Sequence, residues 1–372
     1  MKITQIDIHV LEKPLERPQR NSKATRHSRK FTLVVVHADS GLTGLGDAYG
    51  DQAIMDCILQ RRLGPMLLGA DPRQIDQVWQ RLFASRAIWE PGGSVLCGIS
   101  AVEVACWDLW AKSEGVPVCE LLGGRKRQWI PAYASDLHWD TPQWMAETAA
   151  RYVEQGFRHV KCHVGAPGEF DRDLKRLEAV RQAIGPEAEL MVDLNTGMDY
   201  QQALRFGRAI APLRPFWLEE PLPPWDFEGH RLLEGELGYP VATGENLFTI
   251  HGFRPAWNPL CCRYLMPDVL RCGGLAQMQQ IVREATAAGM IVTPHNYSSG
   301  VGLAATLHLM AAEPQMQLLE YDPTGTAIYE ELFPQPPEVH KGQVRVPSGP
   351  GLGVELGEEV IQRYGVRSFT VK

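Results

Sequence analysis

Ionisable residues recur at regular intervals along the second half of this 372-residue chain. The segment "KCH" carries Lys161 and His163, which would share one face of a strand because side chains alternate between the two faces. The other ionisable residues end successive apolar runs, and each follows the previous one by 23–27 residues. They are Asp193, Glu219, Glu245, Asp268, His295 and Glu320. One ionisable residue per run indicates a single site assembled from several strands, although each residue alone could be a salt-bridged surface residue.

Three of these residues carry carboxylates that would repel one another in a shared site. Asp193, Glu219 and Glu245 end consecutive runs, and like charges that are brought together raise one another's pKa. A divalent cation removes the repulsion, and three oxygen ligands with room for substrate and water suit Mg²⁺. We therefore predict that these three residues bind Mg²⁺. Glu220 is one position out of phase, so it is expected to point toward the helices in a structural role.

The remaining residues are suited to proton transfer. Asp268 and His295 could form a dyad in which the carboxylate fixes the imidazole tautomer, although a structural histidine is the alternative. Glu320 would lie opposite the metal ligands, where a protonated carboxyl can donate a hydrogen bond to an oxyanion. His163 could act as a base near neutral pH without the large pKa shift that a lysine needs. Lys161 is expected to hold charge and to tune its neighbour.

Alternating strands and helices must bring these residues together. From about residue 128, eight β-branched runs alternate with seven helical stretches, which favours a parallel barrel over an open sheet. A barrel carries its chemistry at the C-terminal ends of its strands, where these residues lie. We predict an α/β fold with an N-terminal α+β domain at 1–127, a barrel at 128–335, and a segment at 336–372 that returns to the first domain.

The N-terminal domain contains a basic segment between two predicted antiparallel strands. Residues 2–11 alternate apolar and polar side chains, and residues 31–48 are typical of a hairpin. The segment "ERPQRNSKATRHSRK" between them is expected to be a long loop or lid. Its Arg20, Lys23 and Arg26 are predicted to bind substrate together with Asn195. The alternative is a solvated charged loop. "GLTGLG" resembles a nucleotide-binding glycine loop only faintly, because no helical period follows it.

Composition excludes several other classes of protein. The net charge of −7 and the lack of a long Lys/Arg block argue against a nucleic-acid partner. The chain has no run of about 18 apolar residues, so no membrane span is expected, and its N-terminus lacks the apolar core of a signal peptide. The eight cysteines form no C-x-x-C pair, which favours buried thiols in a reducing cytoplasm.

Seven motifs together resemble the enolase superfamily, specifically its mandelate racemase subgroup, over nearly the whole chain. They are "SAVEVACWDLWAKSEGVPVCELLGG", "VDLN", "LEEP", "TGEN", "MPDVLRCGG" followed by "TPHNYSSG", and "LLEYD". The resemblance implies a (β/α)7β modified TIM barrel with a capping domain formed by both ends of the chain, Mg²⁺ on Asp193, Glu219 and Glu245, and a homo-oligomer. Asp268 stands where muconate-cycloisomerase-like relatives carry a lysine, and "KCH" departs from the subgroup's Lys-x-Lys by placing His163 at the second lysine.

The resemblance also implies a reaction, in which the proton α to a carboxylate is removed to give an enediolate. We predict dehydration of an acid sugar, an aldonate or aldarate, to a 2-keto-3-deoxy acid. One histidine would take the α-proton and His295 would serve the leaving hydroxyl. The alternatives are a racemase or epimerase of a 2-hydroxy acid, in which both histidines exchange one proton, and a non-catalytic barrel that binds acid sugars.

Overall fold

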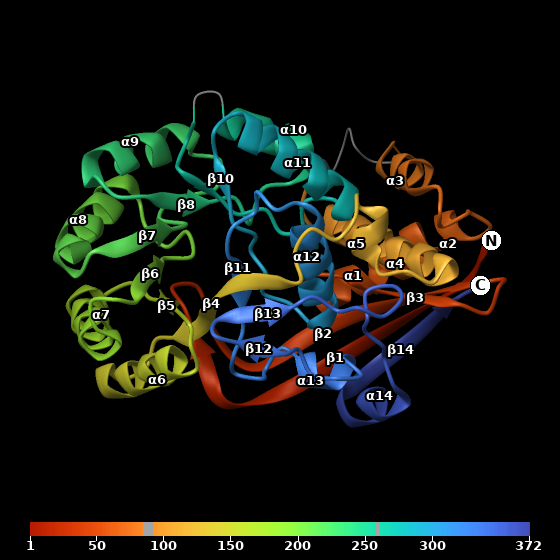
Figure 1. The fold of residues 1–372 in the computed structure, drawn as a ribbon, viewed down its shortest axis with the longest axis horizontal. Coiled ribbons are helices and arrows are strands. Elements are labelled where there is room, and N and C mark those ends of the chain that lie inside the picture. Colours follow the sequence, from red (N-terminus) through yellow and green to blue (C-terminus); the bar gives the residue numbers. More distant parts are fainter. Residues whose placement is uncertain (85–91, 258–259) are drawn as a thin grey trace.

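The structure, a computed structural model, describes residues 1–84, 92–257 and 260–372 (Figure 1). Its first sheet is antiparallel, with the strand order β14–β1–β2–β3. The bounds of these strands are β1 Ile3–Arg20, β2 Thr25–Ala38, β3 Thr43–Asp47 and β14 Gly365–Val371. The first and last strands of the chain therefore pair, so both ends of the chain build the same capping sheet.

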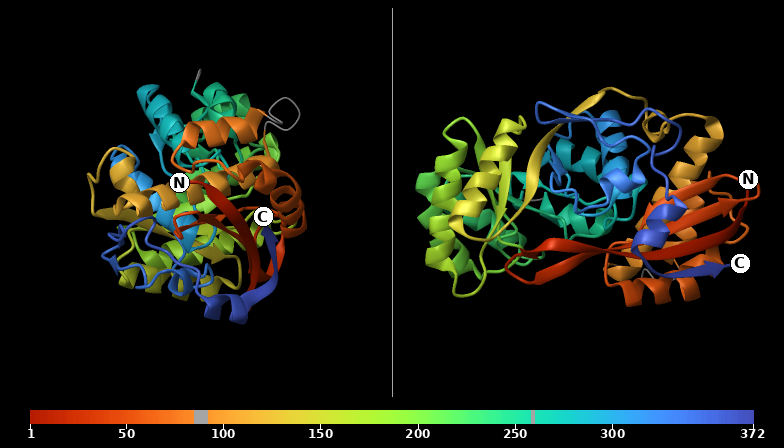
Figure 2. Two further views of the ribbon diagram at one scale, coloured as in Figure 1. Left: turned by 90° about the vertical axis from the view of Figure 1, so that its right-hand side faces the viewer. Right: turned by 90° about the horizontal axis from the view of Figure 1, so that it is seen from below.

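The segment expected to be a long loop is instead the end of a β-hairpin, so that prediction was wrong. β1 and β2 remain paired as far as Arg20 and Thr25, and the side chain of Asn21 accepts hydrogen bonds from the amides of Lys23 and Ala24 in the turn. The hairpin extends from the capping domain to the mouth of the barrel (Figure 2, right). There the hydroxyl of Ser22 donates to the carbonyl of Leu194 at 2.7 Å.

The capping domain also contains a group of helices, of which the first and the longest pack against this sheet. The helices are α1 Gln52–Ile58, the π-helical turn η1 Leu59–Leu63, α2 Gly64–Leu67, α3 Ile75–Ala84, α4 Ser94–Glu114 and α5 Val118–Leu121. α4 ends at Gly115, whose φ of 68° is the left-handed conformation that favours glycine. α4 is long and apolar enough to cross a membrane by composition alone, but 89% of that apolar stretch is buried inside the fold, as in a core helix.

The last two glycines of "GLTGLG", Gly44 and Gly46, serve close packing rather than a nucleotide. They lie on β3, directly against α4, whereas Gly41 lies in the turn before β3. A Cβ atom added at Gly44 would lie 2.0 Å from the carbonyl oxygen of Ala105, and one added at Gly46 would lie 2.0 Å from that of Ala101. Only a residue without a side chain allows the strand and the helix to approach this closely.

The predicted barrel is confirmed, and its eight parallel strands occur at the expected places. They are β4 Trp129–His138, β5 His159–His163, β6 Glu189–Asp193, β7 Pro215–Glu219, β8 Val241–Thr243, β9 Tyr264–Leu265, β10 Ile291–Val292 and β11 Leu319–Tyr321. Successive strands pair from β4 to β10, and β11 pairs with β4. The interior below the site is filled by Tyr133, Met191, Trp217, Ala242, Tyr264 and Met266.

Helices follow the barrel strands and surround them (Figure 1). They are α6 Pro142–Glu154, α7 Phe170–Ile184, α8 Tyr200–Ile210, η2 Ala211–Leu213, α9 Phe227–Leu237, α10 Thr249–Phe253, η3 Arg254–Ala256, α11 Leu275–Ala287, α12 Gly300–Ala312 and α13 Tyr329–Leu332. α12 is buried along its whole length, between β3 and α5 on one side and β4 and β11 on the other. It therefore joins the two domains through apolar packing.

The C-terminal segment contacts both domains. It contains β12 Val339–His340, β13 Gln343–Arg345 and α14 Glu358–Tyr364 before β14. β13 pairs antiparallel with the start of β4, whereas the amide of Val118 in the capping domain donates to the carbonyl of Gly351 at 3.0 Å. The exact domain boundaries stay a prediction.

Candidate active site

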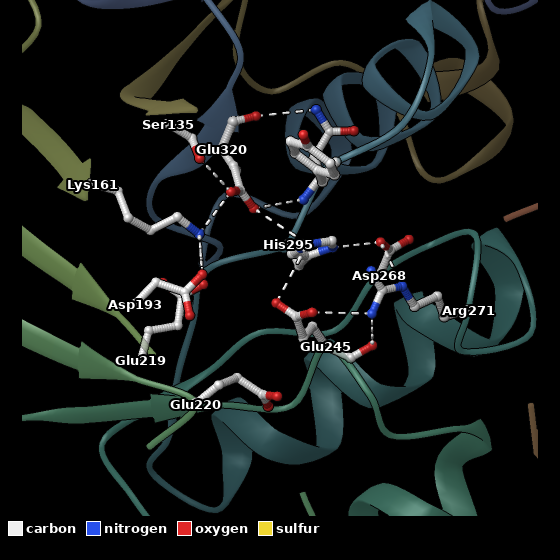
Figure 3. A network of polar contacts seen from close by, with 12 residues as sticks. Ser135, Lys161, Asp193, Glu219, Glu220, Glu245, Asp268, Arg271, His295 and Glu320 are labelled. Carbon is white, nitrogen blue, oxygen red and sulfur yellow. Dashed lines mark hydrogen bonds and ion pairs between the residues drawn. The ribbon is translucent and has the colours of Figure 1, made fainter. Parts of the chain in front are cut away.

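The C-terminal ends of the barrel strands bring all eight predicted ionisable residues into one region. Figure 3 shows all of them except His163. His163, Asp193 and Glu219 lie side by side on three neighbouring strands, paired in register. A cavity of about 240 Å³ is lined by five of the eight, namely His163, Asp193, Glu245, His295 and Glu320. The other three are buried: Lys161 contacts Asp193 and Asp268 contacts His295 in that lining, and Glu219 contacts Lys161.

Lys161 is the charged centre of the site. Its Nζ lies 2.6 Å from Oε1 of Glu219, 2.7 Å from Oε1 of Glu320 and 3.8 Å from Oδ2 of Asp193, and the side chain is 1% exposed. Burial lowers the pKa of Lys161, but the surrounding carboxylates outweigh burial and raise it well above its ordinary value. This arrangement favours the charged form of Lys161 over a free base, and its role in the reaction stays a prediction.

Glu320 accepts hydrogen bonds through both of its carboxyl oxygens in this structure. Burial raises its pKa, but Lys161 and His295 outweigh burial and lower the pKa to about 2. Oε1 accepts a hydrogen bond from the hydroxyl of Ser135 at 2.7 Å, and Oε2 accepts one from the amide of Asn296 at 3.0 Å. These donors favour the ionised carboxylate, and the role of Glu320 as an acid toward an oxyanion stays a prediction.

Asp268 and His295 form the predicted contact. Nδ1 of His295 lies 2.6 Å from Oδ2 of Asp268, and because a carboxylate can only accept, Nδ1 carries the proton (Figure 3). Nε2 is directed toward two other carboxylates, 3.4 Å from Glu245 and 3.9 Å from Glu320. Burial lowers the pKa of His295, but the carboxylates of Glu245, Glu320 and Asp268 outweigh it, so that the pKa is raised.

His163 has one nitrogen bound and one free. Nδ1 lies 3.0 Å from Oδ2 of Asp193 and 3.3 Å from Oδ1 of Asn195. Nε2 is buried and, within the described part of the chain, has no hydrogen-bond partner. Asn195 also donates to Asp193 through Nδ2 at 2.9 Å, so it orients the carboxylate and the imidazole together. A buried nitrogen without a partner, on a residue that lines the cavity, is available to a substrate.

The three predicted metal ligands are held by cations of the chain itself. Glu219 contacts Lys161, and Oε1 of Glu245 lies 3.1 Å from Nη1 of Arg271. Burial and the carboxylates of Asp193, Glu320 and Glu245 raise the pKa of Glu219 well above its ordinary value, against the effect of Lys161. In residues 1–84, 92–257 and 260–372, no three His, Cys, Asp or Glu side chains are grouped closely enough to hold a metal ion. The donor set nevertheless fits Mg²⁺, because it supplies only carboxylate oxygens and its excess negative charge needs a cation.

Two of the three lid cations reach the cavity. Lys23 and Arg26 line it, together with Asn21 and with Tyr297 of the β10–α12 loop. Arg20 does not: its guanidinium lies over the ring of Trp139, 5.6 Å from the centroid, and it is not among the residues that line the cavity. The prediction that Arg20 belongs to the substrate-binding lid is therefore not supported by its position.

The sequence interpretation missed several residues of the site. His138, at the end of β4, lines the cavity, and so does Arg271. The segment "SDLH" ends its strand much as "KCH" does, and that similarity was the available signal. Glu220 is buried with a φ of 43° and accepts hydrogen bonds from Thr243 Oγ1 at 2.8 Å and from Asn246 Nδ2 at 2.8 Å. These contacts agree with a structural role for Glu220 beneath the site.

The fold and the site together define a capped-barrel enzyme whose acid–base residues surround a single cavity. The chain belongs to the enolase superfamily, in its mandelate racemase subgroup. The family "Mandelate racemase / muconate lactonizing enzyme, N-terminal domain" matches residues 5–123, and "Enolase C-terminal domain-like" matches residues 144–360.

Curated relatives and solved structures extend over nearly the whole chain. A D-galactarolactone cycloisomerase from Agrobacterium fabrum is 32% identical and covers 98% of this chain and 99% of its own length. A D-xylonate dehydratase from Haloferax volcanii is 29% identical, over 92% of this chain and 87% of its own length. A racemase from Streptomyces coelicolor with bound magnesium is 30% identical, with a TM-score of 0.89 over 98% and 100% of the two chains. The structure of an L-talarate/galactarate dehydratase variant liganded with Mg and L-glucarate is 27% identical. It has a TM-score of 0.88 and covers 99% of this chain and 93% of its own.

Proposed function

We propose that the protein is a Mg²⁺-dependent hydro-lyase that converts an acid sugar to a 2-keto-3-deoxy acid. The observation that carries the proposal is the pair of histidines that line one cavity, each with Nδ1 on a carboxylate and Nε2 directed elsewhere. Two proton-transfer groups beside one substrate suit a reaction that removes a proton and then protonates a leaving group. The dehydratase relatives support the same reaction class.

The two histidines divide the work. Nε2 of His163 accepts the α-proton, and the electrons of the C–H bond form an enediolate. The imidazolium of His295, stabilised by Asp268, gives its proton to the β-hydroxyl, so that the C–O bond breaks and water leaves. The resulting enol takes a solvent proton at C3 and becomes the ketone. Lys161 remains protonated beside Glu219 and Glu320 and holds positive charge near the substrate carboxylate.

Asp193, Glu219 and Glu245 are the residues that would hold Mg²⁺. When bound, the ion supplies positive charge that polarises the substrate carboxylate and makes the α-proton more acidic. Solved relatives that contain magnesium support this assignment. Binding would also satisfy the carboxylates that now rely on Lys161 and Arg271.

Two isomerisations use the same first step. If the β-oxygen belongs to a lactone ring, its departure opens the ring instead of releasing water, and the cycloisomerase relative supports this variant. Racemisation would instead require both histidines to exchange one α-proton, and the racemase neighbour supports that alternative. A barrel that only binds acid sugars has less support, because binding alone does not need two proton-transfer groups.

The lid favours a substrate with a second carboxylate. Lys23 and Arg26 face the cavity, and neither belongs to an ion pair within the described residues. Two cations without a carboxylate partner suit the far end of an aldarate. We expect Lys23→Ala and Arg26→Ala to lower kcat/KM at least tenfold more for a diacid than for the monoacid of the same chain. Arg20→Ala is the control in the same hairpin, and an equal effect of all three variants would contradict the assignment.

Screening of mono- and diacid sugars with Mg²⁺ tests the reaction itself. The expected result is a 2-keto-3-deoxy acid from at least one sugar, with no product from His163→Asn. Inversion at C2 without loss of water would establish the racemase alternative instead. Assembly as a homo-oligomer and a cytoplasmic location also stay proposals; light scattering of the purified protein tests the first.

A further inference from the structure

The first barrel strand ends in a second carboxylate–histidine pair, which the reaction above does not use. Asp136 and His138 lie at the end of β4 and are 3% and 5% exposed. We propose that Asp136 and His138 are positioning residues that align the ring of His163 for proton removal and join it to the lid hairpin. This inference rests on the proposed function, in which His163 takes the α-proton.

A distortion of β4 brings this pair to the site. The pairing of β4 with β5 shifts register between Ala134 and Leu137, and Asp136 has a φ of 71°. Aspartate adopts this conformation more readily than most residues, yet it still costs free energy, so such positions tend to occur at functional sites. Beyond the shift, His138 is in register with His163 on the neighbouring strand. The distortion therefore places the two imidazoles side by side.

The ring of His138 is held at both nitrogens and on one face. It stacks on the ring of His163, with centroids 4.5 Å apart and planes 14° apart. Nδ1 donates to the carbonyl oxygen of Arg20 in the lid at 3.2 Å. Nε2 contacts the carboxylate of Asp136 and lies 3.3 Å from the hydroxyl of Tyr297. One face and both nitrogens of His138 are thus engaged.

Asp136 continues the connection to the lid. Its Oδ2 accepts hydrogen bonds from Nε2 of Gln19 at 2.7 Å and from the hydroxyl of Thr324 at 3.0 Å. Gln19 in turn accepts from the hydroxyl of Tyr297 at 2.8 Å. A chain of contacts therefore runs from the β1–β2 hairpin through Asp136 and His138 to His163. Within the described residues, Oδ1 of Asp136 has the ion-pair contact with Nε2 of His138 but no hydrogen bond, so the hydrogen bonds of Oδ2 connect Asp136 to the lid.

His163 needs this support because its other restraints lie in the plane of its ring. Asp193 and Asn195 hold Nδ1, but they do not stop the ring from tilting about that contact. The stacked ring of His138 limits the tilt and so fixes the direction of Nε2. A misplacement of about 1 Å at a reacting group can cost about 10²-fold in rate. The ion pairs of His295 within the described residues run to Asp268, Glu245 and Glu320, so the second histidine does not depend on His138.

Three variants test the proposal. Asp136→Asn keeps the side-chain shape and tolerates the left-handed backbone. His138→Asn removes the stacked ring, and His138→Phe keeps a flat ring but loses both polar contacts. With the best acid sugar and Mg²⁺, we measure kcat, KM and the primary isotope effect of a substrate deuterated at the α-carbon. We repeat the measurement with a substrate that carries fluoride in place of the β-hydroxyl, because fluoride leaves without a proton.

We expect Asp136→Asn and His138→Asn to lower kcat at least tenfold and to raise the isotope effect toward its full value, because proton removal becomes rate-limiting. Fluoride should not rescue either variant, whereas it should rescue His295→Asn. His138→Phe should recover part of the loss. An unchanged isotope effect, or rescue by fluoride, would overturn the positioning role, since loss of correctly folded enzyme lowers kcat without changing the isotope effect. A wild-type protein that eliminates neither water nor fluoride would refute the proposed function instead.

Discussion

Lys161→Met tests whether the carboxylates of the site depend on one buried cation. Methionine has a similar length and no charge. Lys161 is 1% exposed, and its Nζ lies within 4 Å of carboxylate oxygens of Asp193, Glu219 and Glu320. Removing one partner from a buried ion pair costs about 3–5 kcal/mol, because it leaves an uncompensated charge in the interior. We therefore expect the metal-free variant to lose about 3–5 kcal/mol of unfolding free energy.

The assay is urea unfolding, followed by circular dichroism, with chelator and then with Mg²⁺. Lys30→Met is the control: Lys30 is 53% exposed and lies 3.9 Å from Glu12, so its loss should cost less than about 1 kcal/mol. If Asp193 and Glu219 bind the metal, Mg²⁺ should stabilise Lys161→Met more than the wild type, because the ion replaces the missing charge. A ligand at 100 times its Kd contributes about 2.7 kcal/mol. Equal stability of wild type and variant in chelator would refute the electrostatic reasoning, and equal stabilisation by Mg²⁺ would argue against Asp193 and Glu219 as ligands.

Three further predictions concern single side chains. Asp268→Asn should lower kcat for dehydration by about 10²–10⁴-fold because it removes the carboxylate that orients and stabilises His295; steady-state kinetics checks this, and a smaller loss is expected with the β-fluoro substrate. Gly46→Ala should destabilise the protein by about 1–3 kcal/mol in a thermal unfolding assay, since the new Cβ would lie 2.0 Å from a carbonyl oxygen of α4. The control is Gly235→Ala, whose new Cβ would meet nothing within 4 Å and which should be neutral or stabilising in that assay. Burial raises the pKa of Glu103 from 4.5 to about 7 despite hydrogen bonds from Ala276, Leu275 and Trp107. The stabilising contribution of Glu103 is then complete below pH 4.5 and is lost as the pH rises through 7. The stability of the wild type relative to Glu103→Gln should therefore fall by about 3 kcal/mol over that range.

Apolar runs predicted the barrel well because parallel strands covered by helices are buried on both faces. The same runs also indicated where each strand ends. The ionisable residues from Lys161 to Glu320 therefore lie around one site, as predicted. The roles of these residues are a separate matter and stay proposals. β4 is the exception, because its pairing with β5 shifts register between Ala134 and Leu137. Asp136 and His138 lie at this irregular strand end and were missed.

The lid shows what the sequence could not reveal. Its strands are polar on both faces, so they lack the alternation that marks a half-buried strand, and the hairpin was interpreted as a loop. Which of Arg20, Lys23 and Arg26 faces the cavity depends on the turn at Asn21 and on the register of β1 with β2. The ionisation of Glu320 likewise follows from its 2.7 Å contact with Lys161, a distance that only the three-dimensional arrangement supplies.

The position of solvent label in the product tests the proposed reaction most directly. The purified protein, loaded with Mg²⁺, is incubated with its best acid sugar in heavy water, and the product is examined by NMR. The mechanism predicts a 2-keto-3-deoxy acid with one solvent deuteron at C3, formed at a rate that falls to background in chelator and returns with Mg²⁺. Recovery of the intact sugar with deuterium at an inverted C2, or full turnover in chelator, would contradict it.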